Sequence, residues 1–139
     1  MRVLDVKALV PWAVEPTTDE QLALEREEIL AHTKRFKREE PTEQQVQALH
    51  ERRAKSRADV AWLRANLPVG TVFEHLGAAC MVVGHCLADH GIGKDWAAEL
   101  DMQTPQGVER VRRFVPTMRA MVEPGFVVET TAPRSRSTQ

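Results

Sequence analysis

Charged residues are concentrated before residue 66, and this contrast limits the folds that the chain can adopt. In segment 17–66, twenty of fifty residues are charged, and the segment has no Gly and a single Pro. In segment 67–128, twelve of sixty-two residues are charged, and this segment holds all seven Gly and both Cys. Charged segments without Gly favour surface helices, whereas frequent Gly turns favour short strands. The contrast predicts an α+β chain.

Two capping signals divide the charged segment into two helices. Thr18 with Gln21, and Thr42 with Gln45, match the capping-box pattern that starts a helix. A Glu-Glu-Pro sequence ends the first helix, because the residue before Pro avoids the α conformation. The short linker predicts an N-terminal antiparallel helical hairpin over residues 17–66.

The second helix carries an apolar seam with a polar centre. Arg53 and Ser56 occupy seam positions, so the seam is either solvated or contacts a partner. A homodimer formed through the seam is one alternative. The seam residues are Val46, Leu49, Arg53, Ser56, Val60, Leu63 and Leu67.

Turn signals in segment 67–131 separate four to five short strands, which predict a small antiparallel β-barrel or curled sheet. Residues 108–115 fit a strand and a short helix almost equally, and residues 126–130 are expected to form the closing strand. Residues 1–16 are expected to be a strand or extended segment because Pro11 and Pro16 oppose a helix. Residues 132–139 are expected to be a flexible tail.

Composition narrows the function classes. A net charge of −1 argues against a globally basic nucleic-acid binder, and two Cys suit a reducing compartment. Asp5 and Lys7 interrupt the first apolar run, which therefore resembles neither a signal peptide nor a membrane span. No nucleophile-elbow, Walker A or dinucleotide motif is present. We expect a cytoplasmic, non-enzymatic protein without a cofactor or a membrane partner.

A cluster of His and Cys between residues 75 and 90 raises the question of a zinc site. His75 and Cys80 are weak candidates, because they could oppose each other across a turn at Gly77. Cys86 near a His is a candidate nucleophile, although nothing marks an electropositive site that would lower its pKa. The alternative is that both Cys are small core residues.

The densest basic run could bind RNA or DNA phosphates, or an acidic partner. The alternative is a solvated strand face balanced by Glu109. The run comprises Arg110, Arg112, Arg113 and Arg119, and a nucleic-acid site would also need arm residues such as Lys34, Arg35, Lys37 and Arg38.

Three carboxylates lie at the expected tip of the helical arm. Glu39 and Glu40 follow the first helix, and Glu43 lies in the first turn of the second. They could engage a cation or a basic pocket of a partner, and the alternative is an ordinary solvated loop.

This layout resembles the Gre transcript-cleavage factors of bacterial RNA polymerase, which carry acidic residues at the tip of a helical hairpin and a small FKBP-like β-domain. Glu39, Glu40 and Glu43 lie near the tip position, and segments 82–84, 88–89, 116–121 and 124–125 are similar to parts of the family's β-domain. The resemblance implies an arm that enters the polymerase channel and helps to place a metal.

The function expected from these features is a non-enzymatic accessory or regulatory protein. It would bind a protein or nucleoprotein complex through the acidic tip, and an inhibitor encoded by a phage or plasmid is one form that such a protein takes. The alternatives are an RNA or DNA binder that uses the arginine run, and an RNA polymerase channel-binding factor of Gre-like layout.

Overall fold

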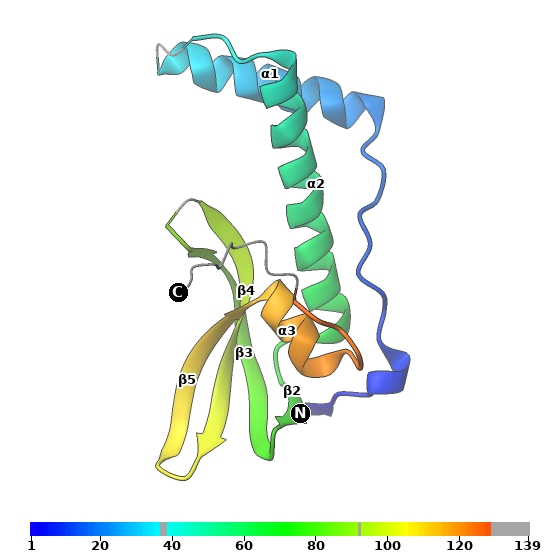
Figure 1. The fold of residues 1–139 in the computed structure, drawn as a ribbon, viewed down its shortest axis with the longest axis vertical. Coiled ribbons are helices and arrows are strands. Elements are labelled where there is room, and N and C mark those ends of the chain that lie inside the picture. Colours follow the sequence, from blue (N-terminus) through cyan, green and yellow to red (C-terminus); the bar gives the residue numbers. More distant parts are fainter. Residues whose placement is uncertain (37–38, 92, 129–139) are drawn as a thin grey trace, which may run out of the picture. The chain divides into compact units, whose positions relative to one another are not determined.

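The computed structural model describes residues 1–36, 39–91 and 93–128, and this part of the chain has an α+β fold. It contains three α-helices and one five-stranded sheet with strand order β1-β2-β3-β4-β5 (Figure 1). Two compact units are present. The helical unit comprises Pro11–Trp62, and the sheet unit comprises Met1–Val10 and the chain from Leu63 onward.

Helix α1 (Asp19–Arg35) and most of helix α2 (Glu43–Asn66) form the helical unit. Both predicted capping boxes are confirmed. The backbone N–H of Gln21 donates to Thr18 Oγ1, and that of Gln45 donates to Thr42 Oγ1, each at 3.2 Å. Side-chain oxygens thus satisfy N–H groups that the first turn of a helix leaves without a partner.

The antiparallel hairpin is not confirmed, because α1 crosses α2 instead of running alongside it (Figure 1). The extended segment 11–17 lies along α2 instead: Trp12 Nε1 donates to Asp59 Oδ1 at 2.8 Å, and Arg57 donates to Thr17 Oγ1 at 3.1 Å. In the helical unit the buried face of α2 comprises Val46, His50, Ala54, Ala58 and Trp62, so it shares only Val46 with the predicted seam. The seam residues Leu63 and Leu67 are buried in the sheet unit.

The sheet is mixed and open, so of the two predicted forms, an antiparallel barrel and a curled sheet, the closed barrel is not confirmed. Strands β2 to β5 form an antiparallel meander, but the short β1 pairs with β2 in parallel. The ambiguous residues 108–115 form a strand as far as Phe114, where helix α3 follows. The bounds are β1 Arg2–Val3, β2 Thr71–His75, β3 Ala78–Asp89, β4 Lys94–Thr104, β5 Gly107–Phe114 and α3 Val115–Val122.

The predicted closing strand at 126–130 is not seen in its described part, since residues 126–128 have no strand structure and residues 129–130 lie outside the described residues. The predicted tail at 132–139 also lies outside them. Lys37 and Arg38, which a nucleic-acid site would also need, likewise lie outside the described residues.

The core of the sheet unit is built from large side chains of helices and strands. The buried face of α3 carries Val115, Met118 and Val122, whose spacing of three and four residues matches the helical period. Leu63 at the end of α2 and Leu100 of β4 are both fully buried in the same unit. Burial of such side chains is the main stabilising contribution to a domain of this size.

Asn66 fixes the N-terminal segment to the end of α2 within the sheet unit. It is 2% exposed, and its side chain bonds to both backbone groups of Val10. Val10 N–H donates to Asn66 Oδ1 at 2.7 Å, and Asn66 Nδ2 donates to the Val10 carbonyl at 2.9 Å. This pairing imitates a strand ladder and satisfies a buried amide that would otherwise be costly.

The turn between β2 and β3 contains an unusual residue. Leu76 has a φ of 50° and is 93% exposed, and it is followed by Gly77 with a φ of 81°. Two consecutive positive φ values are typical of a type I′ hairpin turn, which favours Asn or Gly at both positions. Leucine therefore strains the backbone here, while its side chain gains nothing from burial.

Leu76→Asn is expected to raise the free energy of unfolding by about 1 kcal/mol, because Asn tolerates the left-handed conformation better than Leu. Chemical denaturation followed by circular dichroism measures this change. Leu87→Asn is the control, since Leu87 is 50% exposed within strand β3 and Asn is a poor strand former. A Leu76→Asn protein no more stable than the original would contradict the strain.

Candidate functional site

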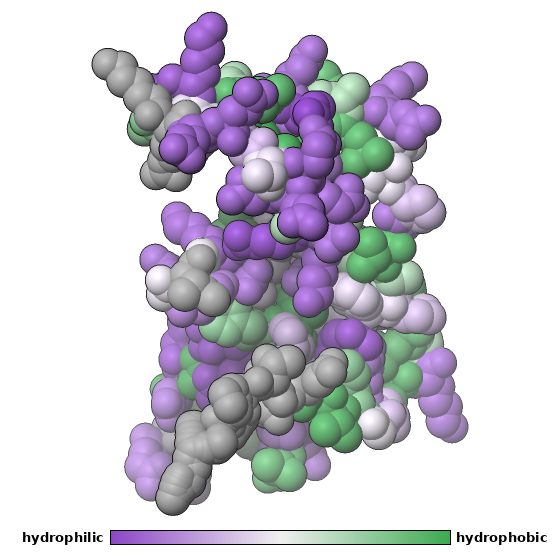
Figure 2. Space-filling model, turned by 45° about the horizontal axis from the view of Figure 1, so that its top comes forward, coloured by the Kyte–Doolittle hydropathy of each residue, from purple (hydrophilic) through white to green (hydrophobic). Residues whose placement is uncertain are grey.

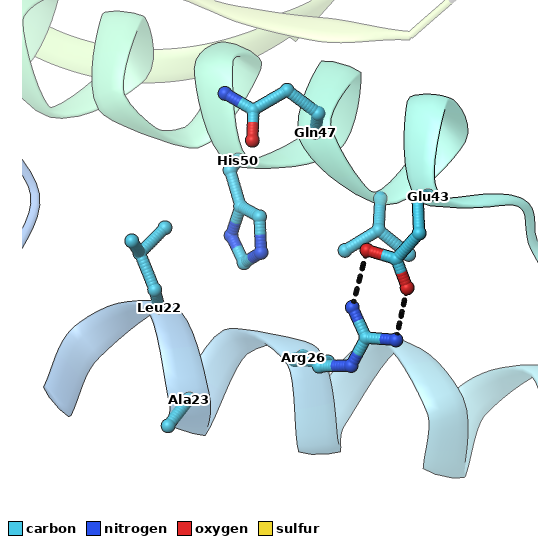
Figure 3. A pocket seen from close by; sticks show the side chains of 7 residues that line it. Leu22, Ala23, Arg26, Glu43, Gln47 and His50 are labelled. Carbon is cyan, nitrogen blue, oxygen red and sulfur yellow. Dashed lines mark hydrogen bonds and ion pairs between the residues drawn. The ribbon is translucent and has the colours of Figure 1, made fainter. Parts of the chain in front are cut away.

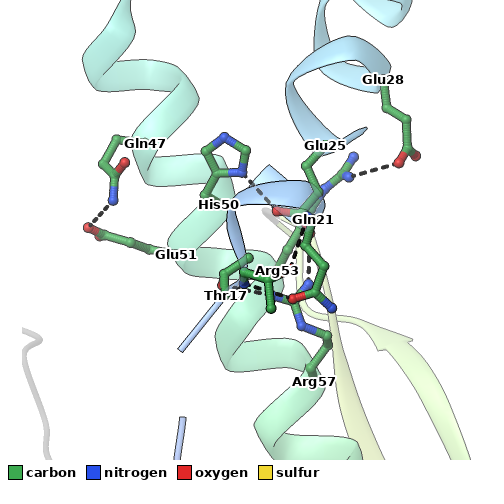
Figure 4. A network of polar contacts seen from close by, with 10 residues as sticks. Thr17, Gln21, Glu25, Glu28, Gln47, His50, Glu51, Arg53 and Arg57 are labelled. Carbon is green, nitrogen blue, oxygen red and sulfur yellow. Dashed lines mark hydrogen bonds and ion pairs between the residues drawn. The ribbon is translucent and has the colours of Figure 1, made fainter. Parts of the chain in front are cut away.

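A buried carboxylate lies where α1 crosses α2. Glu25 of α1 is 7% exposed, and its Oε1 lies 2.8 Å from His50 Nδ1 of α2. Its other oxygen accepts a hydrogen bond from Arg57 at 2.7 Å, and the same guanidinium reaches Thr17 (Figure 4). One carboxylate therefore connects both helices and, through Arg57, the extended segment.

The charges around Glu25 favour its ionised form. Burial raises the pKa of its carboxyl, but hydrogen bonds from His50 and Arg57, together with the positive charges of Arg57 and Arg53, outweigh this effect and lower the pKa overall. Because an ionised carboxylate only accepts hydrogen bonds, the proton in the Glu25–His50 contact belongs to His50 Nδ1.

A pocket of about 240 Å³ opens beside this network, between α1 and the first half of α2 (Figure 3). The His50 ring projects into it. At its rim the Arg26 guanidinium donates to both oxygens of Glu43, and this contact lowers the pKa of the Glu43 carboxyl. The remaining lining residues are Leu22, Ala23, Val46 and Gln47.

The predicted acidic tip is divided by this arrangement. Glu39 and Glu40 are exposed, whereas Glu43 is engaged by Arg26 of α1. A role of all three carboxylates in partner binding stays a prediction. The polar centre of the predicted seam also has an internal partner, since Arg53 Nη1 lies 3.7 Å from Glu28 Oε1.

The predicted arginine patch is paired with carboxylates. Arg110 binds Asp101 at 2.8 Å and lowers the pKa of that carboxyl, and Arg112 lies 3.5 Å from Glu99. These pairs join neighbouring positions of β4 and β5. They offset the positive charge that phosphate binding would need.

The other two arginines of the run also have contacts within the chain. Arg119 binds Glu123 at 3.1 Å, and its guanidinium lies 4.1 Å from the centre of the Phe126 ring. Arg113 donates to the backbone carbonyl of Arg112 at 3.1 Å. The carboxylates that balance this run are thus Asp101, Glu99 and Glu123 and not the expected Glu109, and a nucleic-acid site stays a prediction.

The two zinc candidates do not oppose each other. In the β2–β3 register His75 lies opposite Ala78, and Cys80 lies opposite Phe73. Burial raises the pKa of the Cys80 thiol, which disfavours the thiolate that binds metal. No group of three or more His, Cys, Asp or Glu with metal-binding geometry occurs among the described residues.

The His residues near Cys86 have other partners. His85 Nε2 lies 2.6 Å from the Leu67 carbonyl, and His90 Nε2 lies 2.8 Å from Asp95 Oδ2. Neither contact includes the thiol of Cys86.

Comparison with known proteins brings no further information. No family model matches the chain, and neither a curated protein nor a solved structure matches it significantly. Within the described residues, no helix is both long and apolar enough to span a membrane. The candidate site is therefore argued from its geometry alone.

Sequence reasoning did not find the Glu25–His50–Arg57 network. The signal was present, because His50, Arg53 and Arg57 recur at the spacing of one helical face, as do Glu25 and Glu28. Complementary charges on facing helical stripes indicate a contact between them. The apolar periodicity of the two helices carries no information on these charges.

Glu25→Gln is expected to lower the free energy of unfolding at neutral pH by about 1–3 kcal/mol, since it weakens a buried carboxylate's bonds to His50 and Arg57. A pKa that is lower in the folded state stabilises the fold above the unfolded value and loses this effect as pH falls through the folded value. The difference between the two proteins should therefore shrink below about pH 4.5.

Urea unfolding from pH 3 to pH 8 measures this difference. Glu28→Gln is the control, because the Glu28 side chain is 65% exposed and an exposed ion pair contributes less than about 1 kcal/mol. Equal effects of the two substitutions at neutral pH would show that the buried Glu25 contributes no more to the free energy of unfolding than the exposed Glu28.

Proposed function

We propose that this protein is a non-enzymatic accessory or regulatory protein that binds a macromolecular partner through the C-terminal end of α1. The observation that carries the proposal is an apolar stripe of α1 that is buried in its middle and exposed to solvent at its C-terminal end. Ile29 is 6% exposed, whereas Phe36, seven residues later on the same helical face, is 55% exposed. A large aromatic side chain left in solvent at the end of such a stripe favours docking.

The surroundings of Phe36 suit a protein partner. Its ring lies 4.7 Å from the His32 ring, and the Arg35 guanidinium lies 5.8 Å from its centre. Aromatic residues and Arg dominate the binding energy of protein interfaces. Glu39 and Glu40 are exposed nearby in the sequence, and their charge disfavours nucleic-acid phosphates.

The surface of the helical unit also favours a macromolecule over an enclosed small ligand. Hydrophilic side chains dominate the part formed by α1 and the start of α2, with separate hydrophobic residues between them (Figure 2). Two pockets of this unit have volumes of about 240 Å³ each, smaller than usual small-molecule sites. Such a surface supports recognition by a few anchoring side chains.

Phe36→Ser is expected to weaken partner binding at least about tenfold, because it removes the central aromatic contact. The immobilised protein first captures the partner from a lysate, and titration with the purified partner then measures the affinity of each variant. Leu24→Ser is the matched control, since Leu24 is 60% exposed on a different face of α1.

Replacing Glu39 and Glu40 by Gln tests the contribution of the acidic residues. We expect a lower association rate with a smaller salt dependence, which is typical of charges at the rim of an interface. Equal loss of affinity in Phe36→Ser and Leu24→Ser, or none in either, would overturn the proposed docking at this end of α1.

A further inference from the structure

We propose that the open edge of β5 binds an extended acidic segment of a protein partner, which pairs with β5 as an additional strand. This surface belongs to the sheet unit, so the inference goes beyond the docking proposed for the helical unit. In this mode of recognition, backbone hydrogen bonds along the edge give the affinity, and the side chains opposite the edge give the specificity.

The first observation is a row of backbone groups at the outer edge of the sheet (Figure 1). Strand β5 is last in the strand order, and β4 is its one partner among the described strands. In an antiparallel pair, residues that exchange backbone hydrogen bonds alternate with residues that do not. The register closes at Thr104 and Gly107 across a two-residue turn, which makes these two a bonded pair. The N–H and C=O groups of Val108, Arg110 and Arg112 therefore point away from β4.

A side-chain contact agrees with this alternation. The Arg112 carbonyl accepts a hydrogen bond from Arg113 Nη1 at 3.1 Å, so it is accessible to a donor from outside the β4–β5 pair. An edge that presents unpaired backbone groups is a template for pairing with another extended chain.

The second observation is the charge on one face of this edge. Side chains two residues apart on a strand lie on the same face, so Arg110 and Arg112 are neighbours there, and Val108 lies next to them. The two arginine side chains are 62% and 55% exposed, and Val108 is exposed as well. Glu109 lies on the opposite face. The edge thus presents two positive groups and one apolar group in a row.

The carboxylates of β4 leave hydrogen-bond capacity on both arginines. A guanidinium has five N–H donors. Arg110 uses two of its nitrogens to bind Asp101, and Arg112 reaches Glu99 with one nitrogen at 3.5 Å. A new strand with a carboxylate opposite each arginine would place each guanidinium between two acidic groups, and opposite charges at facing positions stabilise a sheet.

These features define the chemistry of the partner segment. An antiparallel strand would carry acidic residues opposite Arg112 and Arg110 and an apolar residue opposite Val108, with one residue between each. A peptide backbone supplies N–H and C=O groups at the spacing of the edge, whereas a nucleic-acid backbone does not. Glu99 and Asp101, directly behind the arginines, also repel phosphates. The observations therefore favour an acidic extended peptide over RNA or DNA.

The test titrates a peptide with capped ends, Thr-Glu-Thr-Glu-Thr-Val-Thr, into the ¹⁵N-labelled full chain. Hydrogen exchange of the backbone amides is the readout. The N–H groups of Val108, Arg110 and Arg112 should exchange fast in the free protein and at least about tenfold more slowly with saturating peptide, because each gains a partner. The N–H groups of Glu109 and Val111 already bond to β4 and should not change.

Altered peptides separate backbone pairing from charge. Replacing both Glu by Gln should weaken binding about three- to tenfold, and replacing both by Lys should weaken it further. N-methylation of the two Glu removes N–H donors that face β5 and should abolish binding. N-methylation of the two Thr that lie between Glu and Glu and between Glu and Val removes N–H groups that point away, and it should leave binding unchanged.

Matched variants of the chain locate the binding. Arg110→Gln together with Arg112→Gln should bind the Glu peptide about three- to tenfold more weakly, and the corresponding double Lys variant should recover most of the affinity. Arg52→Gln together with Arg64→Gln removes the same charge from exposed positions of α2 and should bind as the original chain does. Circular dichroism checks that each variant is folded.

Equal binding of the Glu and Lys peptides, or of the two N-methylated peptides, would overturn the pairing at β5. Tighter binding of single-stranded oligothymidylate than of the Glu peptide at β5 would overturn it in favour of nucleic acid. Protection of the edge amides that rises with protein concentration, without peptide, would overturn it in favour of a second copy. These outcomes do not involve Phe36, so the docking proposed at the end of α1 stands or fails separately.

Discussion

The helical unit depends on one buried carboxylate. Helix α1 meets α2 only where the two cross, so it buries little apolar surface there, and Ile29 is its one buried apolar residue in the described chain. A buried Glu25 without partners would be costly, and His50 and Arg57 satisfy it only when α1 lies at this place along α2. The ion network thus specifies the crossing.

Features that depend on neighbouring residues could be predicted from the sequence, and those that depend on distant residues could not. The capping boxes at Thr18 and Thr42 and the turns between strands are local, and they are found as expected. The hairpin was predicted because the linker is short. Segment 11–17 lies along the face of α2 that carries Ala54 and Ala58, and its contacts join residues at least 40 positions apart in the sequence.

The candidate site also depends on contacts between distant residues, which the sequence did not predict. The sequence predicts Glu43 as a free carboxylate at the tip of the arm. In the structure the helix crossing places Arg26, seventeen residues earlier, beside it, and the two form an ion pair. Arg53 is a charged residue at an apolar seam position, and its ion-pair partner Glu28 is known only from the structure. Charge complementarity between helical faces would have indicated these contacts, whereas the opening of a pocket beside His50 depends on packing that no periodicity describes.

The arginine-rich strand β5 has a consequence for how copies of the chain behave together. It pairs with β4 on one side, and no described strand pairs with its other side, which leaves a row of backbone groups open to a second chain. A twofold antiparallel pairing centred on Val111 would set Arg110 against Arg112 of the second copy, and centring on either Arg sets like against like. Arginine thus faces arginine in each of these registers, which disfavours edge-to-edge pairing through β5.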